Sequence, residues 1–210
     1  MTSRGREQVV ANTLEMFSMA EAGRADAVSE NPAKRRPGLM NLFTYGRTVT
    51  LTIQTMRSID PEFDVWWKPY QDKMASDKLM RYFNTTRTEI IHEGILNTST
   101  SMVIGGSGPV NMGALFHELT KHAPPNTVRV FLGEGSTGGN GWEVRMPDGS
   151  TTKLYFSLPD SFDIKSELRL PEPPTHHDGK LITDTSAANL ATLYIDSLRQ
   201  IVRDFETRYA

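Results

Sequence analysis

Cysteine is missing altogether from the 210 residues of the chain. Its absence excludes a disulfide framework, a thiol nucleophile, and the cysteine-rich zinc and iron–sulfur sites. No uninterrupted apolar run approaches the roughly 20 residues that a helix needs to span a bilayer, so we expect no membrane partner. The polar beginning, MTSRGRE, leads into no apolar core of signal-peptide length, and we therefore expect a cytoplasmic protein.

An excess of charge of one sign is also missing. Lysine and arginine total 23 against 25 aspartate and glutamate residues, which gives a formal net charge of −2. A basic surface covering the whole protein, as general nucleic-acid binding requires, is therefore excluded, although a local basic face is not. The 38% of hydrophobic residues is enough for a sizeable core and excludes global disorder. The length fits one large domain, or a small domain with an inserted subdomain.

Apolar spacing predicts helices in the first half of the chain. Residues 5–22 form a helix in this interpretation, with Gly23 as its stop, and residues 24–38 form a connection because they lack apolar periodicity. Residues 39–58 are ambiguous. Alternation of Val49, Leu51 and Ile53 with threonines favours a strand, whereas the length of the segment favours a helix. We expect the helix.

The next two helices have clearer signals. The first begins at Asp60-Pro61, because proline at the first helical position loses no hydrogen bond that the helix needs. It carries an aromatic face at helical spacing, which indicates core packing rather than base stacking. Ser76 is expected to cap the second helix, with Asp77 in its first turn, and Gly94 to end it.

A change of period from helical spacing to strict alternation follows residue 126. The segments TVRVFL, WEVRM and TKLYFSL predict three antiparallel strands, joined by a glycine-rich loop over 133–141 and by a turn at 147–149. Before them, residues 95–110 are expected to be extended or loop-like and residues 111–122 a short helix. After them come a proline-rich linker, LPEPPTHHDG, and a long amphipathic helix over 186–209.

These elements predict a mainly α (α+β) chain: a helical bundle interrupted by an antiparallel β meander and closed by the C-terminal helix. The predicted division is a helical region over 1–123, the inserted meander and proline-rich linker over 124–185, and the C-terminal helix over 186–210.

Several motifs with chemical meaning are weak. The glycine-rich segments 105–108 and 133–141 lack the Gly-Lys-Ser/Thr ending of a phosphate loop, so we interpret them as turns. The trio His176, His177 and Asp178 could ligate a metal through two imidazoles and a carboxylate, but adjacent histidines usually point apart. A metal-dependent hydrolase at this trio therefore stays open as an alternative.

Arg87 and His92 form the remaining constellation, on the helix that ends at Gly94. Five positions along a helix turn the two side chains apart by roughly 140°, so they cannot form a tight pair alone. Two copies of the helix facing each other across a dimer could bring two arginines and two histidines to one phosphate. Neutral imidazole can take a 2′-hydroxyl proton, and guanidinium can stabilise the charged phosphorane, without a metal. Alternatively, Arg87 is an ion-pair partner and His92 interacts with the helix dipole.

The stretch resembles the HEPN family, whose helical bundles carry an Arg–x4–His motif late in a helix. Arg87, His92 and the trailing Glu93-Gly94 match that motif, while Thr88 departs from the Asn, Asp or His that usually follows the arginine. The resemblance covers about 39–95 and 186–209.

The resemblance implies a metal-independent endoribonuclease in a toxin–antitoxin or phage-defence context, with a composite site at a homodimer interface and no cofactor. Arg87 would stabilise the phosphate, His92 would be the general base, and Thr88 and Glu93 would contact the RNA substrate. An antitoxin is the protein partner that the resemblance implies. The competing hypothesis is a non-catalytic binding module of the same type, for which Arg87 and His92 are dispensable.

Overall fold

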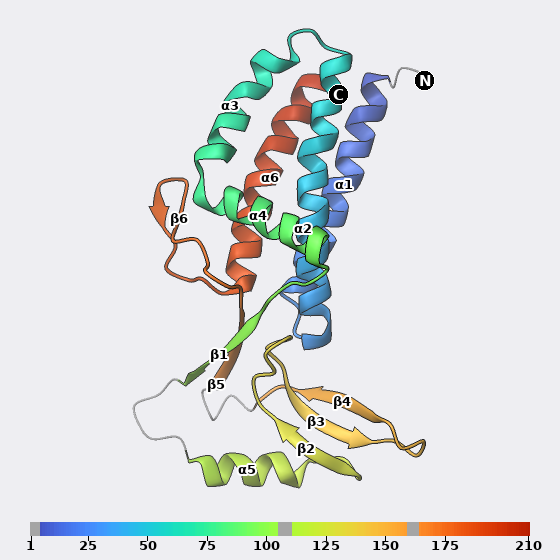
Figure 1. Cartoon of the computed structure of the whole chain (residues 1–210), viewed down its shortest axis with the longest axis vertical. Coiled ribbons are helices and arrows are strands. Elements are labelled where there is room, and N and C mark those ends of the chain that lie inside the picture. The colour runs from blue at the N-terminus through green and yellow to red at the C-terminus, as the bar shows by residue number, and fades with distance from the viewer. Residues whose placement is uncertain (1–4, 105–110, 159–163) are drawn as a thin grey trace. The chain divides into compact units, whose positions relative to one another are not determined.

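The computed structural model describes residues 5–104, 111–158 and 164–210 (Figure 1). Within these ranges the chain combines helices with small antiparallel sheets, which confirms the α+β class. The helices are α1 (Arg6–Ala27), α2 (Pro32–Gln54), the 3-10 helix η1 (Thr55–Ser58), α3 (Phe63–Ser76), α4 (Lys78–Glu93), α5 (Met112–Lys121) and α6 (Ala187–Tyr209). The strands are β1 (Ser99–Ile104), β2 (Thr127–Phe131), β3 (Asn140–Arg145), β4 (Thr151–Phe156), β5 (Ile164–Arg169), β6 (His176–His177) and β7 (Lys180–Leu181). No helix of the described ranges is long and apolar enough to cross a membrane.

Two compact units make up the chain. The helical unit comprises Met1–Ser29, Lys34–Leu96 and Glu172–Ala210, and the second unit comprises Glu30–Ala33 and Asn97–Pro171. After Leu96 the chain therefore passes from the helical unit into the second unit, and it returns to the helical unit at Glu172. The predicted division of the chain into domains, with boundaries after residues 123 and 185, stays a prediction.

Helices α1 and α2 correct the predicted connection over 24–38. Gly23 lies inside α1 instead of ending it, and α2 begins at Pro32. The two helices approach so closely that a Cβ on Gly23 would lie 2.6 Å from the Leu42 backbone nitrogen. A Cβ on Gly38 would similarly lie 2.5 Å from the Ala27 nitrogen. Gly23 therefore allows the two helices to approach each other. A glycine in this role cannot be distinguished from a helix stop by sequence alone.

The ambiguous segment 39–58 is helical, as expected, through α2 and η1. Its threonines fit a helix because their hydroxyls donate to the carbonyl four residues earlier: Thr44 to Met40, Thr48 to Thr44 and Thr52 to Thr48. This bonding satisfies the hydroxyls within the helix, although β-branched residues are more frequent in strands.

The core of the helical unit is built largely from aromatic rings. Phe83 of α4 stacks on Tyr194 of α6 with ring centroids 4.0 Å apart, and it also contacts Phe43 of α2 at 4.6 Å. Trp67 of α3 is fully buried and stacks with Phe63. The aromatic face of α3 is therefore core packing, as predicted.

The cap of α4 differs from the prediction by one residue. Asp77, not Ser76, is the N-cap, and its carboxylate accepts a hydrogen bond from the Met80 amide at 2.9 Å. Ser76 instead donates to the Lys73 carbonyl at the end of α3. The predicted stop is confirmed: Gly94 takes the left-handed conformation, with φ 70°. Helix α6 also begins as predicted, after the cap Ser186.

The second unit confirms the meander, which is a sheet in the order β2-β3-β4. Helix α5, predicted over 111–122, packs Leu115 and Leu119 against this unit's apolar core. Strand β5, which the sequence did not predict, pairs with β1 in a separate antiparallel ladder from Ser99 opposite Arg169 to Ile104 opposite Ile164. Strand β5 was missed because IKSELR has no clear alternation of apolar and polar residues.

Candidate functional site

A two-residue hairpin turn in the helical unit presents the central residue of the candidate site. Strands β6 and β7 pair His177 with Lys180, so that Asp178 and Gly179 form the turn. Both turn residues have positive φ, 48° and 74°. Asp-Gly is the preferred sequence for such a turn, because aspartate and glycine tolerate the left-handed conformation. The tight turn fixes His177 at its edge.

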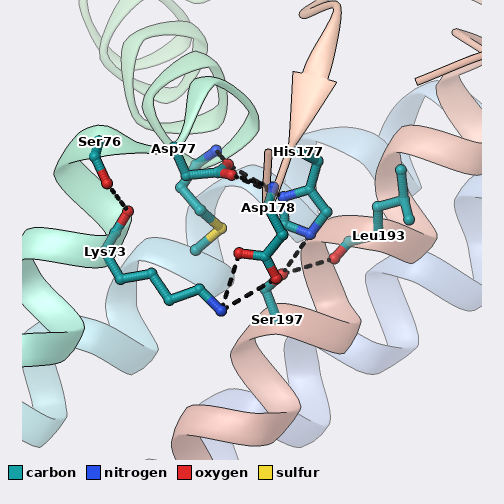
Figure 2. Close-up of polar contacts among 8 residues, drawn as sticks. Lys73, Ser76, Asp77, His177, Asp178, Leu193 and Ser197 are labelled. Atoms are coloured by element: carbon teal, nitrogen blue, oxygen red, sulfur yellow. Dashed lines mark hydrogen bonds and ion pairs between the residues drawn. The ribbon is translucent and has the colours of Figure 1, made fainter. Parts of the chain in front are cut away.

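Asp77 connects this hairpin to the start of α4 (Figure 2). Its carboxylate side chain is only 6% exposed and accepts from the Asp178 amide at 2.7 Å, besides the Met80 amide. Both carboxylate oxygens lie 3.1 Å from Nδ1 of His177. Burial alone would raise the pKa of Asp77, but the hydrogen bonds from the two amides and from His177 outweigh burial and lower the pKa. Asp77 is therefore an ionised acceptor.

The ionised state of Asp77 determines the tautomer of His177. A carboxylate only accepts hydrogen bonds, so Nδ1 of His177 carries a proton and donates a hydrogen bond to Asp77. In the neutral imidazole, Nε2 is then an acceptor. Nε2 lies 3.1 Å from Oγ of Ser197, on α6, and completes a continuous chain Asp77–His177–Ser197 (Figure 2).

The hydroxyl of Ser197 has two partners for its single proton. It lies 3.1 Å from the Leu193 carbonyl, four residues earlier in α6, and at the same distance from Nε2 of His177. With neutral His177 the hydroxyl can donate to Nε2. With protonated His177, Nε2 becomes a donor and the hydroxyl turns to the Leu193 carbonyl. The protonation state of His177 therefore determines whether the Ser197 hydroxyl can donate its hydrogen bond to Nε2.

Asp77, His177 and Ser197 line a pocket of about 280 Å³ between α3, α4, the hairpin and α6. Lys73 lies at this pocket and pairs with Asp178, with Nζ to Oδ1 at 2.9 Å (Figure 2). Gln200 adds an amide, and the apolar walls come from Met74, Met80, Leu193 and Ile201. Tyr70 also lines the pocket; burial and its bond to the Asp204 carboxylate raise its pKa to about 12. The site combines a hydroxyl, an imidazole, hydrogen-bond donors and apolar walls, as a small-molecule pocket does.

The predicted metal trio is brought together only in part. His177 and Asp178 converge with Asp77, such that one ligand atom from each lies within 4.8 Å of the others. His176 does not join them, because its Nδ1 pairs with the Thr175 hydroxyl at 2.9 Å. Adjacent residues of a strand point to opposite faces, which explains why the two histidines separate.

The residues of the predicted ribonuclease site lie on α4. Arg87 is half-buried, and its Nε is buried without a hydrogen-bond partner in the described part of the chain. His92 and Glu93 are exposed in the last turn, and the Thr88 hydroxyl donates to the Asn84 carbonyl. Among the described residues no hydrogen bond or ion pair joins Arg87 to His92, in agreement with the angle between them. The homodimer and the RNA substrate stay predictions.

The glycine-rich segments have different outcomes. The connection from β2 to β3 lies in the predicted segment 133–141, except that Asn140 and Gly141 already belong to β3. Glu134 closes the connection by accepting from Thr137 and Tyr155. The segment 105–108 lies outside the described residues.

The comparison with protein families matches a part of the chain that lies mainly, but not entirely, in the helical unit. A family model described as bacteriophage lambda protein ea47 matches residues 23–104, which is less than half of the chain. The match includes Asp77, but neither His177 nor Ser197. Neither the curated proteins nor the solved structures give a match to the chain.

The resemblance to the HEPN family is wrong. The family model that matches is the ea47 family, and no HEPN family matches. An arginine and a histidine at fixed spacing on a helix are two residues only, and helices with aromatic faces are common to many bundles, so the shared features do not discriminate between families.

Sequence reasoning missed Asp77 as a site residue, and it also missed Lys73 and Ser197. Two signals in the sequence point to the site. Ser197 interrupts an apolar row at i−4 and i+4, formed by Leu193 and Ile201, and Asp178-Gly179 marks a hairpin that presents His177. The contact of Asp77 with a residue 100 positions away has no local signal.

Proposed function

We propose that the helical unit carries a hydrolase site in which Ser197 is the nucleophile, His177 the general base and Asp77 the residue that orients the base. The observation that carries this proposal is the continuous chain of contacts, 3.1 Å from Asp77 to Nδ1 and 3.1 Å from Nε2 to the Ser197 oxygen. A nucleophile in reach of a base, which a third group orients, is the geometric signature of nucleophilic catalysis.

The chemistry we propose is acyl transfer. The Ser197 oxygen bonds to the carbonyl carbon of an ester while its proton passes to Nε2 of His177. His177 then gives this proton to the departing alcohol, as the ester C–O bond breaks and leaves an acyl-serine. A water molecule then gives a proton to Nε2 of His177 and bonds to the acyl carbon; the bond from this carbon to the Ser197 oxygen breaks, His177 returns the proton to that oxygen, and the carboxylic acid leaves.

The pocket supports a small ester with an apolar part. The negative oxygen of the tetrahedral intermediate needs donors, and Lys73 and Gln200 line the pocket and carry such donors, whereas the Tyr70 hydroxyl already donates to Asp204. The methionine, leucine and isoleucine walls favour an apolar acyl or alcohol group. Lys73 must leave its pair with Asp178 in part to reach this oxygen.

Hydrolysis of p-nitrophenyl acetate and butyrate tests the proposal. We expect turnover by the full chain, and its loss in Ser197→Ala and in His177→Ala. Ser76→Ala is the matched control, because it deletes a hydroxyl that also bonds a helix carbonyl, at 3.0 Å, but lies outside the chain of contacts. Equal activity of Ser197→Ala and Ser76→Ala would refute the assignment of the nucleophile.

A divalent-metal hydrolase is the second candidate, and the convergence of Asp77, His177 and Asp178 favours it. Carboxylate and imidazole ligands suit zinc, which can activate a bound water. In that case His177 would bind the metal instead of donating to Asp77. Metal analysis of the purified chain separates the two candidates: one equivalent of metal, lost in Asp178→Asn together with activity, would favour the metal site over the serine nucleophile.

A further inference from the structure

A second pocket of the helical unit, of about 310 Å³, has the chemistry of an anion site. Arg47 of α2 and Arg81 of α4 line it, and Gln71, Thr50 and Asn84 add polar groups. Within the described residues its lining holds no carboxylate. Met74 and Met80 line this pocket and also the first one, so the two pockets are neighbours.

Neither arginine is neutralised. In the ranges that the structure describes, Arg47 and Arg81 form no ion pair, whereas Arg199 of the same unit pairs with Glu21 and Asp196. The side-chain contact of Arg47 is with a neutral group, the Thr50 hydroxyl, at 3.1 Å. Two guanidinium groups therefore meet at one concave surface with their charge available for an anion.

Tyr194 provides an independent observation. It is 5% exposed and lines the same pocket, yet its hydroxyl has no hydrogen-bond partner among the described residues. The hydroxyl is not sealed inside the protein, since the described side-chain atoms that are fully buried without a partner belong to Arg24, Trp67 and Arg87; it is therefore open to the pocket that Tyr194 lines. The Tyr194 ring lies against Gly46, which has no side chain: a Cβ on Gly46 would lie 2.5 Å from Cε1 of Tyr194 and 2.8 Å from its hydroxyl oxygen. A bound acceptor would satisfy the hydroxyl.

We propose that this pocket binds the phosphate group of a small molecule, with Arg47, Arg81 and Tyr194 as donors. Guanidinium groups match phosphate oxygens with two parallel hydrogen bonds, and three separate oxygens suit three donors from three helices. The site does not rest on the proposed hydrolase, since none of these three residues belongs to the chain of Asp77, His177 and Ser197.

Calorimetric titration of the full chain with inorganic phosphate, and in a second arm with glycerol phosphate, tests the proposal at constant ionic strength. We expect Arg47→Gln to weaken binding about tenfold or more, as the loss of a bond to a charged group does. Tyr194→Phe should weaken it about threefold or more while it keeps the ring against Phe83. Tighter binding of glycerol phosphate than of phosphate would support an organic phosphate, and the reverse would support the free ion.

Three matched variants locate the site. Arg203→Gln removes an exposed arginine of α6 outside both pockets, and Lys73→Gln removes the cation of the first pocket, so both should bind phosphate as the wild type does. Arg81→Gln changes an exposed side chain and should weaken binding even if Arg47→Gln fails to fold. Absence of binding by the wild type would overturn the proposal. An equal loss in Arg203→Gln or Lys73→Gln would also overturn it, and so would acetate binding as tight as phosphate binding.

Discussion

Replacing Asp77 separates the structural role of this carboxylate from its proposed chemical role. Asp77→Ala removes the cap of α4, which is worth about 1 kcal/mol. It also leaves the Asp178 amide and Nδ1 of His177 without an acceptor, at about 1–3 kcal/mol for each group when it is fully buried. His177 is half-buried and water can reach the vacated space, so we expect a total loss of about 2–4 kcal/mol.

Asp77→Asn keeps one carbonyl oxygen, which can still cap α4 or accept from the Asp178 amide. We therefore expect a smaller loss, about 1–2 kcal/mol. The asparagine NH2 group would face Nδ1 of His177, and the imidazole would move its proton to Nε2. His177 would then donate to Ser197 instead of accepting from it. Esterase turnover should fall by about 10⁴-fold, as the same change does in serine proteases.

Urea unfolding at pH 7 measures the stability of both variants, with the slope checked for constancy, and turnover of p-nitrophenyl butyrate measures their activity. We expect the wild type to have the highest free energy of unfolding, Asp77→Asn a lower one and Asp77→Ala the lowest. Equal stability of all three proteins would refute the contacts of Asp77. Full activity of a folded Asp77→Asn would refute the role of Asp77 in orienting His177.

Three further predictions concern stability. Gly46→Ala should lower the free energy of unfolding by about 1–3 kcal/mol, since its Cβ would overlap the Tyr194 ring; an unchanged urea midpoint would contradict this close approach. Phe83→Ala should cost about 3–5 kcal/mol by urea unfolding, because the ring is 1% exposed and stacked, and a loss below about 1 kcal/mol would contradict its burial. Because the pKa of Asp77 is lowered from 3.8, its contribution is full above that pH and is lost as the pH falls through its lower folded value. Unfolding between pH 5 and pH 2 should therefore show a drop that is smaller in Asp77→Asn, and identical pH dependence of the two proteins would contradict it.

Much of the fold could be predicted from the sequence because its signals are local. The meander follows from alternation, α6 from its apolar row, and the end of α4 from Gly94. The predictions that failed depend on contacts between elements. Gly23 looks like a stop until α2 lies against it, and β5 is recognised by its pairing with β1 rather than by its own composition.

The candidate site could be predicted only in part, for the same reason. His177 and Asp178 stood out because imidazole and carboxylate are chemically distinctive side chains in a short loop. Asp77 was recognised only as part of a helix start, and Ser197 was one hydroxyl in a long helix. Their convergence requires the hairpin to fold back on α4 and α6, across 100 and 20 residues of chain.

Labelling by a fluorophosphonate tests the central claim most directly, because this reagent bonds to a serine that a base activates. The wild-type chain and His177→Ala would be treated at pH 8, digested, and analysed by mass spectrometry, with Ser76→Ala as a control for folding. The proposed site predicts one adduct, on Ser197, that disappears in His177→Ala and persists in Ser76→Ala. No adduct on Ser197, or an adduct there that does not depend on His177, would contradict it.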